Sequence, residues 1–165
     1  MGFQVMGLGK ARTAALLVLI FGLVGCDHVT KHVAKTTLED GGVQPLISNV
    51  LNLRYVENRD IAFNLLGAVP ESVRSPLLLI VGALAIIGLT ILVLSSRQGS
   101  RWKTLALSVV LAGAAGNYID RLWRGYVVDF VQLTHWPVFN MADVYVTLGG
   151  VLLLLLAGRQ RAAPA

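Results

Sequence analysis

The sequence has few charged residues and a single cysteine. Only 14% of its 165 residues are Asp, Glu, Lys or Arg, whereas soluble domains usually contain about a quarter. This scarcity argues against a soluble globular domain. Cys26 alone excludes an intramolecular disulfide and a cysteine-rich metal site. We also find no basic motif typical of nucleic-acid binding, so we expect no nucleic-acid partner, and the net charge of +5 needs another explanation.

What the sequence does contain is long apolar runs. Residues 77–94 hold no charged side chain, and as a helix they would rise about 27 Å, close to the thickness of a hydrocarbon core. Further runs cover 104–119 and 138–157. A weaker run at 13–26 reaches spanning length only if its helix continues to about Ala34. The sequence therefore predicts an all-α membrane protein, one domain over 1–165, with four transmembrane helices at about 12–34, 75–95, 103–122 and 138–158.

The basic residues indicate how these helices are oriented. Seven of them lie near the termini or between the second and third runs, in segments without acidic residues: Lys10, Arg12, Arg97, Arg101, Lys103, Arg159 and Arg161. All nine acidic residues lie in the remaining segments, toward the other side. Because positively charged loops stay in the cytoplasm, both termini are predicted to be cytoplasmic. Anionic lipid headgroups are the expected contact of this basic fringe.

The end of the first apolar run leaves two alternatives open. Residues 23–26, Leu-Val-Gly-Cys, have the form of a bacterial lipoprotein cleavage box, which would predict a cleaved signal peptide and a lipid on Cys26. Three further apolar runs favour an uncleaved first span instead. His28 and His32 are four residues apart and could hold zinc, but the Glu of a His-Glu-x-x-His motif is absent. We therefore expect no metal site.

A polar stretch between the first and second spans is predicted to lie outside the membrane. Within residues 36–70, Leu51, Leu53 and Tyr55 alternate with polar residues, and this period of two predicts a short strand. A small extracytoplasmic β-rich cradle between helices one and two would cover a site at the outer ends of the helices. A solvated connecting loop is the alternative.

The third span differs from the others in its small and polar residues. Small residues at 112–116 let helix backbones approach closely, which predicts the packing centre of the bundle. Asn117, Asp120 and Arg121 then fall at i, i+3 and i+4, on one helix face where the span ends. An arginine here needs an anion nearby, and Asp120, Asp129 or a lipid phosphate could serve.

Two aspartates lie between the third and fourth spans, where ionisable residues are costly and usually functional. Asn140 and Asp143 are three residues apart at the start of the fourth span, and Asn140 is suited to cap that helix. If Asp129 and Asp143 lie within a few ångströms, like charge raises the pKa of one, and the pair holds one proton at neutral pH. One carboxylate could then deprotonate water while the other hydrogen-bonds a scissile carbonyl, as in aspartic proteases. The alternative is that both only pair with Arg121 and Arg124 to close the bundle.

Five short blocks in this order form a recognisable pattern. They are Asp27 with Thr30-Lys31, Asn58 with Ala62-Phe63, Gly116-Asn117 with Asp120-Arg121, Gly125 with Val128-Asp129-Phe130, and Phe139-Asn140 with Ala142-Asp143. The last three blocks, at this spacing between two spans, are highly specific. With them the chain resembles the bacterial lipoprotein signal peptidases, also called type II signal peptidases, over most of its length.

The resemblance implies a four-span aspartic endopeptidase of the bacterial inner membrane, with cytoplasmic termini and an active site near the outer face. It implies diacylglyceryl-modified prolipoproteins as substrates, cut on the amino side of the lipidated cysteine. We expect no cofactor, membrane lipids as the other partner, and a monomer. By motif match Asp129 and Asp143 would be the catalytic pair. Substrate-binding or supporting roles are implied for Asp27, Lys31, Asn58, Asn117, Asp120, Arg121 and Asn140.

Two departures from the family pattern concern the surroundings of the site. Asp60 stands where the family usually has glycine, which reduces backbone freedom and adds a carboxylate. The connection from Asp129 to Asp143 is short, which would leave the cleft more open. Two other functions stay open from the residues alone. One is a proton-linked transporter using the same carboxylates, although the charges gather at one membrane face. The other is a structural or lipid-anchored protein processed at Cys26.

Overall fold

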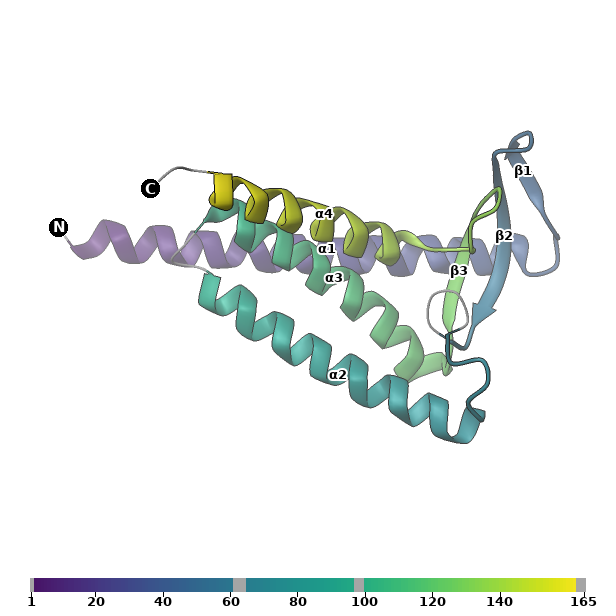
Figure 1. Ribbon diagram of the computed structural model, residues 1–165. Helices are drawn as coiled ribbons and strands as arrows, with labels where there is room; N and C mark the ends of the chain where they lie inside the picture. The colour runs from purple at the N-terminus through teal and green to yellow at the C-terminus, as the bar shows by residue number, and fades with distance from the viewer. Residues whose placement is uncertain (1, 61–64, 97–99, 163–165) are drawn as a thin grey trace.

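The computed structural model describes residues 2–60, 65–96 and 100–162, with side chains described over 9–60, 65–96 and 100–159. Ala62, Phe63 and Arg97, and the side chain of Arg161, lie outside these ranges. The described elements are α1 (Gly2–Leu38), β1 (Gln44–Ile47), β2 (Leu51–Asn58), α2 (Glu71–Ser96), α3 (Arg101–Arg124), β3 (Val127–Leu133) and α4 (Met141–Ala162). The helices run along one another, the sheet lies across one end of them, and both termini lie at the opposite end (Figure 1).

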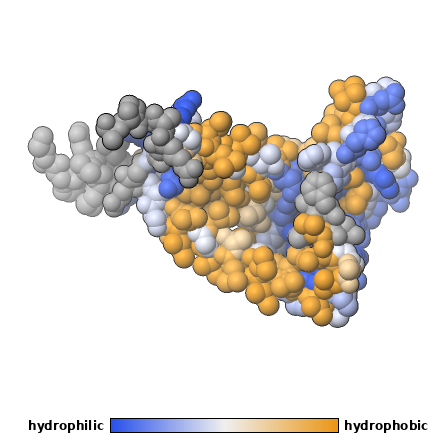
Figure 2. All heavy atoms as spheres, viewed as in Figure 1, coloured by the Kyte–Doolittle hydropathy of each residue, from blue (hydrophilic) through white to orange (hydrophobic). Residues whose placement is uncertain are grey.

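Three of these helices are long and apolar enough to cross a membrane, judged by length and composition. The segments are Gly9–Leu38, Glu71–Ser96 and Met141–Arg159. Their outer faces carry exposed large apolar side chains such as Phe21, Leu84 and Leu154. Apolar residues cover much of the helices, whereas hydrophilic ones gather toward the sheet (Figure 2). The chain therefore has the surface of a membrane protein, as its composition predicted.

The helix α3 does not belong to that apolar set, so its crossing of the membrane stays a prediction. It packs against α1, α2 and α4, and its polar residues Thr104, Ser108 and Asp120 are buried in these contacts. A Cβ added to Gly113 would meet the Ala142 carbonyl oxygen and the Val146 side chain of α4. The predicted packing centre at 112–116 is thereby confirmed. The polar side chains of α3 lower its mean hydropathy. They are buried against the neighbouring helices.

The sheet is antiparallel with strand order β1-β2-β3, and it corrects the predicted cradle. The prediction drew the strands only from the segment between the first two helices, but β3 comes from between α3 and α4. In the β2–β3 pairing Val56 lies opposite Asp129, and Asn58 lies opposite Val127. Residues 127–130 of β3 are all buried, so the strand lacks the polar–apolar alternation that reveals strands in sequence. Pairing with β2 therefore fixes the position of Asp129 in the sheet, opposite Val56.

Candidate active site

Asp129 and Asp143 reach the same cavity from different elements. Asp129 lies in β3, Asp143 lies in the first turn of α4, and both line a cavity of about 720 Å³. Asp129 is only 2% exposed. The sequence-predicted pair is therefore brought to one concave site near the sheet end of the bundle.

Asn140 connects the two aspartates. Its Nδ2 donates to Oδ1 of Asp129 at 2.6 Å, and its Oδ1 accepts the backbone N–H of Asp143 at 3.1 Å. In return Oδ2 of Asp143 accepts the backbone N–H of Asn140 at 3.0 Å. This reciprocal pair is a helix cap in which Asp takes the place of the usual Glu, so the predicted capping role of Asn140 is confirmed. The cap and the contact to Asp129 use one side chain that is fully buried.

The remaining carboxylate oxygens of the pair also accept from amides. Asn58 Nδ2 donates to Oδ2 of Asp129 at 2.8 Å, and Asn117 Nδ2 donates to Oδ1 of Asp143 at 2.8 Å. Within the described residues neither aspartate forms an ion pair. Two carboxylates that share a cavity and form no direct ion pair favour retaining one proton between them.

Among the described contacts neither Arg121 nor Arg124 forms an ion pair with these aspartates, which argues against the alternative of a purely structural ion pair, although the charge of Arg121 acts on both carboxyl groups at longer range. Arg124 lies 3.0 Å from Asp120 instead. Arg121 donates to the backbone carbonyl oxygens of Asp60, at 2.8 Å, and of Asn117, at 3.4 Å. The predicted pairing of Arg121 with Asp120 or Asp129 is not found among the described contacts. Arg121 is one of the residues that line the cavity.

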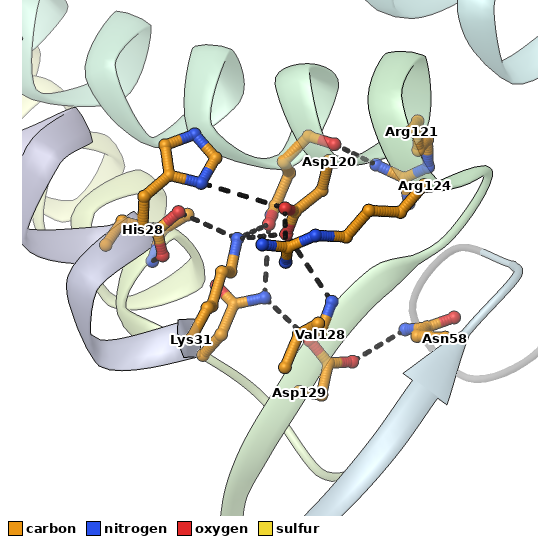
Figure 3. Close-up of polar contacts among 12 residues, drawn as sticks. His28, Lys31, Asn58, Asp120, Arg121, Arg124, Val128 and Asp129 are labelled. Carbon is orange, nitrogen blue, oxygen red and sulfur yellow. Dashed lines mark hydrogen bonds and ion pairs between the residues drawn. The ribbon is translucent and has the colours of Figure 1, made fainter. Parts of the chain in front are cut away.

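A buried ionic cluster joins α1 to α3 (Figure 3). Lys31 Nζ is 2.7 Å from Asp27 and 2.9 Å from Asp120, and all three side chains are at most 1% exposed. The predicted i, i+4 pair of Asp27 and Lys31 is confirmed. His28 Nδ1 lies 3.7 Å from Asp120. Asp120 thus contacts α1, and Asn117, predicted on the same face, both accepts from Lys31 Nζ at 3.0 Å and lines the cavity.

Asp27 also reaches the helix that carries Asp143. Its Oδ1 accepts the backbone N–H of Ala142 at 2.9 Å. A Cβ on Gly116 of α3 would lie 2.5 Å from the other carboxylate oxygen, so a glycine here makes room for Asp27. The preceding residue, Cys26, is exposed within α1, which continues to Leu38. The part of α1 that follows Cys26 is therefore built into the framework of the site.

Asp60, the departure from the family pattern, orders the chain after β2. Its backbone N–H donates to Oδ1 of Asn58 at 2.9 Å, which leaves Asn58 Nδ2 to face Asp129. Its own Oδ1 accepts the N–H of Leu66 at 3.2 Å, and its Oδ2 lies 3.9 Å from Arg74. Its φ is not among the positive values of the described chain, so the loss of glycine imposes no left-handed strain.

The helix α2 contributes a wall of the cavity that sequence reasoning missed. Leu78, Gly82 and Ala85, within the uncharged run that predicted this span, line the cavity. The ring of Tyr118 lies directly against Gly82, where an added Cβ would come within 2.7 Å of it. Small residues three apart on an otherwise bulky helix were the available signal, because such positions often mark close approach.

The short connection from Asp129 to Asp143 folds back against β3. Phe139 and Val131 exchange hydrogen bonds, with N···O distances of 2.9 and 2.8 Å. His135 adopts a positive φ of 63° in the turn between them. Trp136 and Pro137 then line the cavity, so this connection forms part of its wall.

Burial alters the acidity of Asp129. It raises the pKa of this carboxyl from 3.8 to about 6, and the nearby charge of Asp143 raises the pKa further, while the hydrogen bonds from Asn58 and Asn140 oppose the increase. A carboxyl with this pKa can hold or release a proton near neutral pH. It is therefore suited to general acid–base chemistry.

The raised pKa of Asp129 predicts that folding stability increases as pH falls. The folded protein binds this proton below about pH 6 and the unfolded chain only near 3.8, so stability rises as pH falls through this window. From pH 7 to pH 5 the gain is about 1 kcal/mol, or about 2–4 °C in Tm. Thermal unfolding in detergent measures it. The difference in Tm between the protein and Asp129→Asn must change over this range, and a constant difference would contradict the prediction.

Comparison with known proteins identifies a family. The family model described as signal peptidase (SPase) II matches residues 19–158. Proteins named lipoprotein signal peptidase are similar to the chain: one from Streptococcus thermophilus is 34% identical, covering 90% of this chain and 95% of that protein, and one from Clostridium novyi is 32% identical, covering 88% and 97%.

Solved structures agree with the sequence relatives. A bacterial membrane enzyme superposes with a TM-score of 0.81 at 27% identity and covers 90% of each chain. A second has a TM-score of 0.73 at 26% identity, covering 87% of this chain and 92% of the other. The matched range includes all of β1, β2, β3, α2 and α3, and with them the cavity and its two aspartates. The chain belongs to the signal peptidase II family.

Proposed function

We propose that this protein is an aspartic endopeptidase that removes signal peptides from diacylglyceryl-modified prolipoproteins, with Asp129 and Asp143 as its catalytic pair. Family membership supports a lipoprotein signal peptidase. The observation that carries the aspartic mechanism is one buried amide, Asn140, hydrogen-bonded to both carboxyl-bearing residues at the wall of a cavity. Amide donors hold both carboxylates in place without neutralising them.

In this mechanism Asp143 carries the negative charge and Asp129 carries the proton. Asp143 lies at the positive end of α4 and accepts hydrogen bonds from the backbone N–H of Asn140 and from the side-chain amide of Asn117. Asp129 lies on a strand, receives only the side-chain amides of Asn58 and Asn140, and is deeply buried. Burial favours its protonated form.

The reaction then needs only these two carboxyl groups and water. Water attacks the scissile carbonyl carbon and gives a proton to Asp143, while Asp129 gives its proton to the carbonyl oxygen. When the resulting diol collapses, one hydroxyl returns a proton to Asp129, and Asp143 passes its proton to the leaving nitrogen. The C–N bond breaks, and both carboxyl groups regain their starting states.

Several features support the membrane arrangement that goes with this role. The described basic residues Lys10, Arg12, Arg101, Lys103 and Arg159 lie at the end opposite the sheet, so the positive-inside rule supports cytoplasmic termini and a site near the outer face of the bacterial inner membrane. We propose α3 as the fourth span, because its Arg101–Arg124 helix would rise about 36 Å. Trp102 and Trp123 near its two ends suit the two interfaces.

The cavity supports a substrate that stays in the membrane. Leu78 and Ala85 of α2 and Val146 of α4 give it an apolar wall beside the aspartates. Two acyl chains on a lipidated cysteine would remain among lipids, and the peptide could enter from the side at headgroup depth. Membrane lipids are then the other partner of the protein.

The proposal predicts cleavage by the purified protein in lipid nanodiscs. A diacylglyceryl-modified precursor is expected to be cut once, on the amino side of the lipidated cysteine, as determined by mass spectrometry of both products. The matched control is the same precursor without the lipid, which is expected to remain uncut. Failure to cut the lipidated precursor would overturn the proposed function, whereas equal cutting of both precursors would overturn the substrate class.

A further inference from the structure

Lys31 is an ammonium group enclosed in the centre of the protein. Its side chain is 0% exposed, and its Nζ lies 2.7 Å from Asp27 Oδ2, 2.9 Å from Asp120 Oδ2 and 3.0 Å from Asn117 Oδ1. The ammonium group is thus paired with two carboxylates and hydrogen-bonded to one amide oxygen. Lys31 does not line the cavity. Any effect of Lys31 on the site is therefore exerted through its neighbours.

The neighbour that links Lys31 to the proposed catalytic pair is Asn117. The amide oxygen of Asn117 accepts from Lys31 Nζ at 3.0 Å and from Asn140 Nδ2 at 3.1 Å. Its Nδ2 is thereby directed to Asp143 Oδ1, at 2.8 Å. If the amide turned over, its NH₂ would face the ammonium and its oxygen would face a carboxylate, and both contacts would be repulsive. The charge of Lys31 thus determines which atom of Asn117 faces Asp143.

The ion pair between Lys31 and Asp27 also connects to the helix that carries Asp143. Asp27, the ion-pair partner of Lys31, accepts the backbone N–H of Ala142 in the first turn of α4. Lys31 therefore contacts Asn117, whose amide hydrogen-bonds Asp143, and Asp27 contacts the backbone of the helix that carries Asp143. No other residue in the described part of α1 hydrogen-bonds to Asn117 or to the Ala142 N–H.

We propose that Lys31 is a positioning residue that holds Asp143 in its working orientation through Asn117. The inference rests on the proposed function, because it assigns Lys31 a role in the activity of that site. Lys31 itself touches no substrate atom. Its loss should lower the rate of the chemical step and leave substrate binding intact.

The test compares Lys31→Met with Arg124→Gln in the precursor assay. Both variants remove one positive charge from Asp120, but only Lys31 contacts Asn117, since Arg124 Nη1 bonds Asp120 Oδ1. A misplacement of about 1 Å at a reacting group can cost on the order of 100-fold, so kcat of Lys31→Met should fall about 100-fold with KM unchanged. Arg124→Gln should keep kcat and KM close to those of the unmodified protein.

The pH profile supplies a readout that a merely structural role would not move. The charge of Lys31 lowers the pKa of Asp129, so its removal should shift the pH profile of kcat to higher pH. The other charged groups that act on Asp129 are Asp143 of α4 and Arg121 of α3. Around Lys31 lie the charged groups of Asp27 and Asp120, with Arg124 and the titratable His28 beyond Asp120. Arg124→Gln leaves the contact between Lys31 and Asn117 in place and should shift the profile less.

A second variant distinguishes a loss of kcat from a failure to fold. Asp27→Asn combined with Lys31→Met removes one charge of each sign, and it keeps the oxygen that accepts from Ala142. This double variant should fold and show the same loss of kcat. Equal kinetics of the Lys31 and Arg124 variants, or failure of both Lys31 variants to fold, would overturn the inference. If the unmodified protein does not cut the precursor, or Asp143→Asn still cuts it, the proposed function fails instead.

Discussion

Asp129→Asn and Asp143→Asn are each expected to lower kcat for precursor cleavage by about 100- to 10,000-fold. Each substitution preserves the shape of the side chain but removes the group that accepts or donates a proton. Asp143→Asn removes the base that activates water, and Asp129→Asn removes the acid that protonates the carbonyl oxygen. Mass spectrometry of the products with purified variants in nanodiscs measures the loss.

Asp60→Asn provides the matched control, because Asp60 also lines the cavity and is 5% exposed. Its Oδ1 already serves to accept the N–H of Leu66, a role that an amide oxygen keeps. The rate should therefore stay close to that of the unmodified protein. Thermal unfolding of all three variants shows whether they are folded. Substantial turnover by either variant of the proposed pair would remove the aspartic mechanism, and loss of activity in Asp60→Asn would make Asp60 a third functional carboxyl group.

Local spacing was enough to predict the contacts that lie within one helix. Asp27 and Lys31 form the predicted i, i+4 pair, and Asn140 caps α4 as its position before an apolar run indicates. These contacts depend on the geometry of a single helix, which is the same in every protein. The small residues at 112–116 likewise indicated the packing centre because only a few side chains permit close helix contact.

Contacts between elements could not be predicted in this way. The strand β3 has four consecutive buried residues and therefore no period of two, although its pairing with β2 brings Asn58 to Asp129. Asn117 and Asp120, three apart on one helix, both contact Lys31 of α1, but only Asn117 also reaches Asp143 at the cavity. The sequence supplies the functional groups, and the tertiary packing decides which groups meet.

The electrostatic difference between the two aspartates follows from this packing. A strand offers Asp129 no helix terminus, whereas α4 offers Asp143 its N-terminal N–H groups. Two identical side chains thereby receive different surroundings: burial raises the pKa of Asp129, whereas Asp143 accepts a backbone N–H at a helix terminus. Asn140 is the side chain that contacts both surroundings at once, through its amide and its cap.

Asn140→Ser and Asn140→Ala are expected to separate these two roles of Asn140. Both variants lose the Nδ2 donor to Asp129 and Asn117, so kcat should fall by about 100-fold in each, as expected for a misaligned reacting pair. Serine can still accept the N–H of Asp143 and cap α4, whereas alanine cannot. Asn140→Ala should therefore be less stable than Asn140→Ser by about 1 kcal/mol, measured by thermal unfolding in detergent.

The comparison of the two variants decides what the rate depends on. If activity follows the cap, Asn140→Ser retains most of its turnover and only Asn140→Ala loses it, and the link between the carboxyl groups is then unnecessary. If activity follows the amide, both lose it equally while only their stabilities differ. The second outcome is the one we expect, because the cap fixes Asp143 alone, whereas only the amide fixes Asp129 relative to it. A shared proton requires the position of each carboxyl group to be fixed with respect to the other.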